Sequence, residues 1–163
     1  MNIFDLSDKI AVVTGGNQGI GYGISRGLAM SGATVIIANR RGEEGKNAAE
    51  TLRKEGLNAE AIATDVSKLS SVADLVSQVI DRFGKIDILV NNAGVILRKP
   101  AEDFTEEDWD DTLEIHLTAA FLLSQAAARD MIRRKRGKII NMASIWSFQG
   151  GMNVLAYAAA KHG

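Results

Sequence analysis

Short apolar runs alternate with longer amphipathic segments along the chain. The apolar runs are rich in Val and Ile, as in strands that are buried on both faces of a parallel sheet. They predict strands at residues 9–14, 34–38, 86–91 and 138–143, and the less apolar run at residues 58–64 predicts a weaker strand. The segments between them have helical periodicity and end at a glycine or close to one. They predict helices at residues 19–31, 43–55, 70–83 and 105–136.

The regular alternation of strands and helices predicts an α/β fold. Crossover connections between parallel strands are right-handed, so the elements should form a doubly wound, Rossmann-like sheet in three αβα layers. No linker or repeat interrupts the series, and residues 1–163 are predicted to form a single domain. The long helix begins at Thr105, with Asp108 three residues further on, which approximates a capping box.

A glycine-rich turn, Thr14-Gly-Gly-Asn-Gln-Gly-Ile-Gly21, joins the first strand to the first helix. Glycines allow backbone N–H groups to approach a pyrophosphate, and the helix N-terminus adds a partial positive charge. Three residues separate Gly15 from Gly19, so the turn differs from the usual G-x-G-x-x-G fingerprint, and no Lys-Ser or Lys-Thr follows it, so it is not a Walker loop. Its position between strand and helix favours a nucleotide site over a purely structural turn.

A tyrosine and a lysine, Tyr157 and Lys161, lie four residues apart, so a helix would place them one turn apart on one face. An ammonium stabilises a phenolate by Coulomb attraction, which makes Tyr157 a candidate proton donor and acceptor. Ser144 stands thirteen residues upstream of Tyr157. Taken alone, such a Tyr/Lys pair is more often part of a solvated helix face.

Composition excludes several classes of function. The chain is 46% hydrophobic and 24% charged with a net charge of −1, so we expect neither nucleic acid nor an anionic membrane as partner. The basic run 133–136 complements the C-terminal dipole of a helix, and a nucleic-acid or lipid contact is the alternative. The absence of cysteine excludes disulfides and thiolate catalysis, and two histidines predict no metal site. Without a recognisable signal peptide or long apolar stretch, a cytoplasmic location is predicted.

Together the motifs resemble the short-chain dehydrogenase/reductase family. The motifs that support this resemblance are the glycine turn, Asn91-Asn-Ala-Gly94, Ser144 and Tyr157-x-x-x-Lys161. They occur in the family's order and spacing over essentially the whole chain. The resemblance implies an oxidoreductase that transfers a hydride between a nicotinamide and a carbonyl or secondary alcohol. The small-molecule substrate stays open among sugar acids, polyols, ketones and 3-oxoacyl groups.

The resemblance also implies the catalytic roles. Tyr157 would exchange a proton with the substrate oxygen, Lys161 would stabilise the phenolate, and Ser144 would hydrogen-bond the substrate oxygen. His116 stands where many relatives carry an Asn that holds a water linked to the lysine. An imidazole, which titrates at about pH 6.5, would take the place of that Asn in the proton relay. The alternative is a histidine that fills the space and slows proton exchange.

The cofactor contacts implied by the resemblance lie at the glycine turn, at three strand ends and on the Tyr/Lys helix. They are Gly15, Asn17, Gln18, Gly19, Ile20, Gly21, Asn39, Arg40, Arg41, Asp65, Val66, Asn92, Ala93, Gly94, Tyr157 and Lys161. An acidic residue after the second strand favours NAD(H) in the family. Here Asn39 is neutral, and Arg40 and Arg41 can grip a phosphate, so NADP(H) is favoured over NAD(H). The glycine turn itself lacks the basic residue found in many NADP-preferring relatives.

Family members continue beyond the Tyr/Lys helix with further strands and a substrate-covering segment. We therefore expect a C-terminally incomplete family fold, with an unpaired edge at residues 138–143 and a Tyr157 helix of less than two turns. A homo-oligomer, dimer or tetramer, is implied through residues 105–136 and the Tyr157 helix. The alternatives to an active enzyme are a weakly active or inactive nucleotide-binding fragment, or a stretch of a longer protein.

Overall fold

A computed structural model describes residues 3–163, which contain a five-stranded sheet in the order β3-β2-β1-β4-β5. Every pairing between neighbours in this sheet is parallel. The strands are β1 (Ile10–Thr14), β2 (Thr34–Asn39), β3 (Ala59–Ala63), β4 (Ile88–Asn91) and β5 (Lys138–Asn141). The doubly wound, Rossmann-like fold is thus confirmed, and β5 lies at the edge of the sheet as expected.

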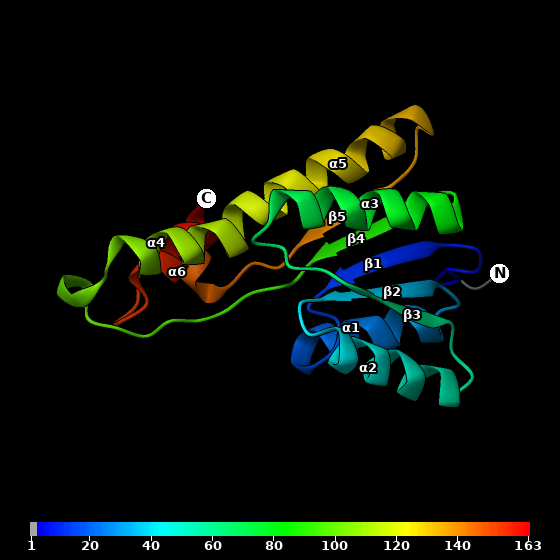
Figure 1. Cartoon of the computed structure of the whole chain (residues 1–163), viewed down its shortest axis with the longest axis horizontal. Helices are drawn as coiled ribbons and strands as arrows, with labels where there is room; N and C mark the ends of the chain where they lie inside the picture. Colours follow the sequence, from blue (N-terminus) through cyan, green and yellow to red (C-terminus); the bar gives the residue numbers. More distant parts are fainter. Residues whose placement is uncertain (1–2) are drawn as a thin grey trace.

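Helices cover both faces of the sheet (Figure 1). One face carries α1 (Gly19–Met30) and α2 (Gly42–Lys54), and the other carries α3 (Leu69–Phe83) and α5 (Ala119–Arg133). In β1, Ala11 and Val13 belong to the core on the first face, while Ile10 and Val12 belong to the core on the second. Both sets must be apolar, which explains the unbroken Val/Ile runs.

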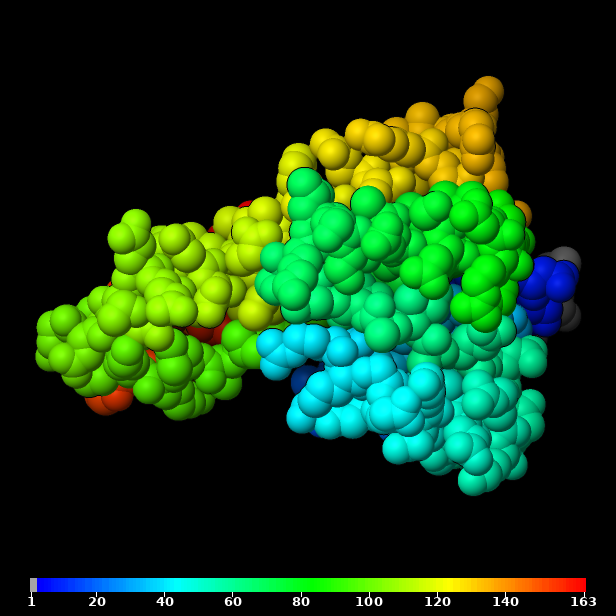
Figure 2. All heavy atoms as spheres, in the orientation of Figure 1, coloured from blue at the N-terminus to red at the C-terminus, as the bar shows by residue number. Residues whose placement is uncertain are grey.

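Two segments leave the carboxyl edge of the sheet and form an arm that projects beyond it (Figures 1 and 2). The first, residues 92–118, contains η1 (Ala101–Asp103), α4 (Glu106–Leu113) and the π-helical η2 (Glu114–Thr118), and it leads directly into α5. The second, residues 142–163, contains η3 (Ile145–Ser147) and α6 (Leu155–His162). The backbone N–H of Lys99 donates to the carbonyl of Asn153 at 3.1 Å and ties the two segments together. None of the helices formed by residues 3–163 has the length and apolar character needed to cross a membrane.

The long helix predicted at residues 105–136 begins as expected but differs in its middle and at its end. The Thr105 hydroxyl accepts from the Asp108 N–H, and the Asp108 carboxylate accepts from the Thr105 N–H, both at 3.1 Å, which confirms the capping box. The π-helical turn was not predicted. The helix stops at Arg133 because Lys135 adopts a left-handed φ of 53°. Lys135 thus ends the helix, a role that the sequence had assigned to Gly137.

The helix that carries Tyr157 is longer than expected. It contains eight residues, slightly more than two turns of about 3.6 residues, where the sequence predicted less than two. Ala156, Ala158 and Ala160 are buried along it, so packing within the arm supports the helix.

A buried ion-pair network fastens α5 to the start of β4. Arg134 contacts Asp87 at 3.0 Å and Asp130 at 2.8 Å, and both carboxylate side chains are at most 5% exposed. Burial raises the pKa of Asp87 and Asp130, but hydrogen bonds from Ile10 N–H, Ile86 N–H and the neighbouring cations outweigh it and lower both pKa values. The basic run at the helix end thus contributes to the fold.

The variant Arg134→Ala leaves two buried carboxylates without their shared cation. We expect the free energy of unfolding to fall by about 3–5 kcal/mol. Arg133→Ala is the matched control, because Arg133 pairs with the same Asp130 but is 74% exposed, and its loss should cost less than about 1 kcal/mol. Urea denaturation measures both, and equal losses would contradict the structural role of Arg134.

Candidate active site

The carboxyl ends of β1 and β4 are joined by two side chains, and we call this junction the seam. The Thr14 hydroxyl accepts from the N–H groups of Asn92 and Ala93, both at 2.9 Å. The Asn92 amide donates to the carbonyls of Thr14 at 2.9 Å and Gly15 at 3.3 Å. The connections reverse direction between β1 and β4, which is where open α/β sheets bind ligands.

The glycine turn places the N-terminus of α1 beside the seam. A side chain at Gly21 would overlap the carbonyl oxygen of Gly15, so glycine is needed for this close approach. Gln18 forms no capping hydrogen bond, and the first turn of α1 has no acidic residue, whereas α4 has a capping box and three acidic residues. The first N–H groups of α1 are therefore available to an anion.

A cleft of about 180 Å³, the arginine cleft, opens beside the glycine turn. Its walls include many of the residues expected to contact a cofactor: Gly15, Asn17, Gln18, Asn39, Arg40, Arg41, Asp65, Val66, Ala93 and Gly94. The Ser67 hydroxyl donates to Asp65 at 2.7 Å, and this hydrogen bond is the main reason that the pKa of Asp65 is lowered. Glu44 also lines the cleft, and no sequence motif pointed to it.

A second cavity of about 280 Å³, the tyrosine cavity, shares Gly94 and Val95 with the arginine cleft. The Lys161 ammonium donates to the Met142 carbonyl at 2.6 Å and lies 5.7 Å from the centre of the Tyr157 ring. Burial lowers the pKa of Lys161. The cavity brings together residues that are far apart in the sequence: Ile20, Asn92, Gly94, His116, Tyr157 and Lys161.

His116 holds the residues that join the two cavities. Its Nε2 lies 2.6 Å from the Val95 carbonyl oxygen and 3.0 Å from the Val95 nitrogen, so the tautomer decides which of the two is its hydrogen-bond partner. Its ring meets the Tyr157 ring edge-on, with centres 4.9 Å apart. A Cβ on Gly94 would overlap the imidazole. His116 lies in the π-helical turn, an irregularity that is common at functional sites.

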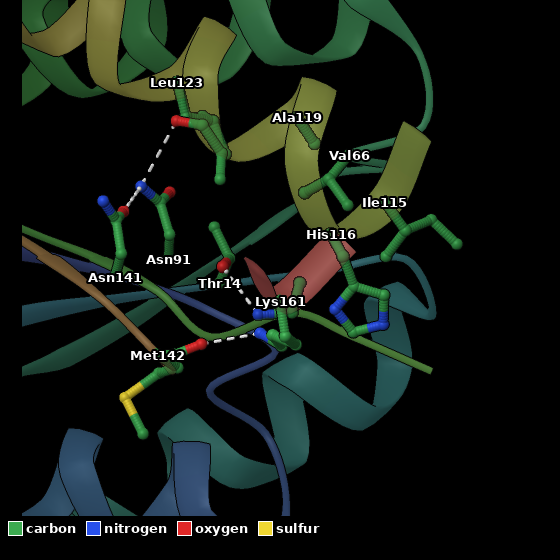
Figure 3. Close-up of a pocket in the computed structure, with 12 residues that line it drawn as sticks. Thr14, Val66, Asn91, Ile115, His116, Ala119, Leu123, Asn141, Met142 and Lys161 are labelled. Atoms are coloured by element: carbon green, nitrogen blue, oxygen red, sulfur yellow. Dashed lines mark hydrogen bonds between the residues drawn. The ribbon is translucent and has the colours of Figure 1, made fainter. Parts of the chain in front are cut away.

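A small cavity of about 30 Å³, the inner cavity, lies between Lys161 and β4 (Figure 3). The Asn91 amide donates to Asn141 at 2.8 Å and to Ser124 at 3.0 Å. Among residues 3–163, Asn91 Oδ1 and His116 Nδ1 are buried without a hydrogen-bond partner, and both residues line this cavity. A polar cavity of this size suits about one water molecule.

The surroundings keep His116 neutral at neutral pH. Burial lowers its pKa, the hydrogen bond to Val95 opposes that shift, and the nearby Lys161 ammonium lowers the pKa further. The titration near pH 6.5 expected from the sequence is therefore displaced to more acidic pH. The contacts of the imidazole with Val95 and Tyr157 are compatible with a neutral ring, and the proton relay stays a prediction.

Ser144 and two of the expected glycines lie outside the cavity walls. Ser144 caps η3, where its hydroxyl accepts from the Trp146 N–H at 3.3 Å. Met142 and Ala143, just before it, line the tyrosine cavity, whereas Ser144 does not. Gly19 and Gly21 shape the turn and line neither the arginine cleft nor the tyrosine cavity.

Comparison with known proteins identifies the family. A model of the short chain dehydrogenase family matches residues 9–163. The 2-dehydro-3-deoxy-D-gluconate 5-dehydrogenase of Dickeya dadantii is 41% identical over 162 residues, which are 99% of this chain and 63% of that protein. The chain therefore belongs to the short-chain dehydrogenase family, and it spans about 63% of the length of this relative.

Two solved structures show the same arrangement of elements. A gluconate 5-dehydrogenase from Burkholderia cenocepacia J2315, in complex with NADP and tartrate, is 38% identical with a TM-score of 0.92 and covers 98% of this chain and 62% of its own. An NAD+-bound xylitol dehydrogenase is 32% identical with a TM-score of 0.91, and the match covers 96% of this chain and 60% of the xylitol dehydrogenase chain. The fold thus occurs with either nicotinamide dinucleotide.

Replacing His116 tests its buried, neutral state. A histidine whose pKa is lowered by folding binds protons more weakly in the folded chain, so the free energy of unfolding should fall as pH drops below about 6.5, by at most about 1.4 kcal/mol per pH unit. His116→Asn should remove this contribution, and His162→Asn, on the exposed second histidine, should keep it. Urea titrations from pH 7.5 to 5 would compare the slopes, and identical slopes in wild type and His116→Asn would contradict the assignment.

Replacing Gly94 tests the contact with the imidazole. Gly94→Ala overlaps His116 and should lower the free energy of unfolding by about 1–3 kcal/mol. Gly27→Ala in α1 meets no atom within 4 Å and should stabilise the chain by about 0.5–1 kcal/mol. Urea denaturation separates the two, and an unaffected Gly94→Ala would show that residues 94–95 are not held by His116.

Proposed function

We propose that the chain carries the cofactor site and the proton-transfer residues of an NADP(H)-preferring dehydrogenase that acts on CH–OH and C=O groups of a sugar acid. The observation that supports it most is the tyrosine cavity, which Tyr157 and Lys161 line and which shares Gly94 and Val95 with the arginine cleft. Relatives named for gluconate and 2-dehydro-3-deoxy-D-gluconate support the choice of substrate class.

The residues at the carboxyl edge fit a nicotinamide dinucleotide. The uncapped N-terminus of α1 and the glycine turn would hold the pyrophosphate. Arg40 and Arg41 would face a 2′-phosphate, Asp65 and Val66 the adenine, and residues 92–94 the adjoining ribose. When bound, the cofactor supplies or accepts the hydride.

Tyr157 and Lys161 would manage the proton. The Tyr157 hydroxyl gives its proton to a carbonyl oxygen as it gains negative charge, and takes one back from an alcohol in the reverse direction. Lys161, held by the Met142 carbonyl, stabilises the phenolate that remains. Ser144 accepts from the Trp146 N–H and keeps its own hydroxyl hydrogen to donate to the substrate oxygen.

His116 would act mainly by position. Its Nε2 contacts fix Val95 between the two cavities, and its edge contact limits the orientation of the Tyr157 ring. Its Nδ1 faces the inner cavity together with Lys161, so a water there would connect them even while the imidazole stays neutral. Because Nε2 is engaged by the Val95 backbone, which neither supplies nor takes up a proton, the neutral imidazole would hydrogen-bond and position this water without passing a proton through the ring.

Replacing Tyr157 tests the proposed activity. With NADPH and 5-keto-D-gluconate, Tyr157→Phe should lower turnover about 10²–10⁴-fold, because the general acid is lost, while NADPH affinity stays near that of the wild type. Tyr22→Phe is the control, since Tyr22 is the other tyrosine and lies on α1 outside the tyrosine cavity. Absorbance at the nicotinamide band measures turnover.

Two outcomes would contradict the proposal in different ways. Equal turnover in wild type and Tyr157→Phe would remove Tyr157 from the chemistry. NADPH binding without turnover of any gluconate, polyol or 3-oxoacyl compound would favour the alternative of a nucleotide-binding module without activity of its own.

A further inference from the structure

Glu44 bridges the two sides of the arginine cleft. Its Oε1 lies 3.0 Å from Nη1 of Arg41, and its Oε2 accepts from the Asn17 amide at 3.1 Å. Asn17 belongs to the glycine turn and Arg41 precedes α2, so the carboxylate connects the two elements that border the cleft. The Glu44 side chain is 41% exposed, which leaves it accessible to a ligand in the cleft.

The cleft therefore has less positive charge than its two arginines suggest. Arg41 is already paired with Glu44, and a phosphate dianion that binds Arg41 must compete with this carboxylate. The carboxylate and the phosphate would also repel each other inside one cleft. A ribose with a free 2′-hydroxyl meets neither difficulty, and its hydroxyl can donate to a carboxylate oxygen.

Asn39 does not perform that accepting role. It is 7% exposed, its amide donates to the Arg41 carbonyl at 2.6 Å, and its Oδ1 is buried against Gly45 without a hydrogen-bond partner among residues 3–163. Asn39 thus shapes the turn that presents Arg40 and Arg41. The carboxylate that lies beside Arg41 in the cleft is that of Glu44.

We infer that Glu44 sets cofactor selectivity in this chain, by competing with a 2′-phosphate for Arg41 and accepting from an unphosphorylated ribose. This inference rests on the cofactor part of the proposed function. It predicts that the preference for NADP(H) is smaller than the Arg40–Arg41 pair alone would give, and that NAD(H) also binds. Glu44 is a specificity-determining residue and takes no part in proton transfer.

The test uses nucleotides that occupy only the arginine cleft, so that binding does not depend on the tyrosine cavity. Calorimetric titration of the whole chain with 2′,5′-ADP and with 5′-AMP gives an affinity ratio. Glu44→Gln and Glu44→Ala should each raise this ratio about fivefold, because both remove the competing charge. The increase should shrink at high salt, where exposed charges are screened.

Glu43→Gln is the matched control. Glu43 precedes Glu44 in the first turn of α2, but it is 81% exposed and pairs with Lys46 outside the cleft. It removes the same charge from the same helix end, so its ratio should stay within about twofold of the wild type.

The possible results are distinct. An unchanged ratio in both Glu44 variants, a rise in Glu44→Ala alone, or an equal rise in Glu43→Gln would overturn the inference. A wild-type chain that binds neither nucleotide would overturn the inference together with the cofactor part of the proposed function. Wild-type binding of both nucleotides with no change in the Glu44 variants would leave the proposed function standing and remove only the role of Glu44.

Discussion

The seam between β1 and β4 is the constraint on which the site depends. Where the chain leaves β4, the Thr14 hydroxyl satisfies two backbone N–H groups, and where it leaves β1, the Asn92 amide satisfies two carbonyls. A buried polar group left unpaired would cost about 1–3 kcal/mol, so the two chain exits are fixed against each other. The glycine turn and residues 92–95 are consequently held together as one rigid surface at the base of the site. His116 connects this surface to the arm through its contacts with Val95.

The two edges of the sheet use charge in different ways. At the amino edge, Arg134 is enclosed with Asp87 and Asp130, and this network holds α5 in place. At the carboxyl edge, Arg41 and Glu44 stay accessible within a cleft, and Lys161 is only partly enclosed. The first arrangement stabilises the fold, and the second leaves charged groups that can exchange their partners for a ligand.

The hydrophobic pattern and the capping residues predicted the fold well because the strands and helices arise from local features of the sequence. Burial on both faces requires apolar residues along β1, β2 and β4, and Thr105 with Asp108 marks the start of α4. Three features could not be predicted from hydrophobic periodicity because they depend on particular contacts or backbone angles. They are the π-helical turn, the early stop at Lys135 and the hydrogen bond between Asn17 and Glu44. The acidic displacement of the His116 titration likewise arises from burial beside Lys161, residues far apart in the chain. Self-association through residues 105–136 and α6 stays a prediction.

A crystal structure of the chain with bound NADPH would test the central claim, that the arginine cleft and the tyrosine cavity form one dinucleotide site joined at Gly94 and Val95. We expect the adenosine between Arg40 and Val66, the pyrophosphate at the N-terminus of α1, and the nicotinamide against Tyr157 and Lys161. Adenosine outside the arginine cleft, or a nicotinamide that leaves the tyrosine cavity empty while the adenosine is ordered, would contradict it.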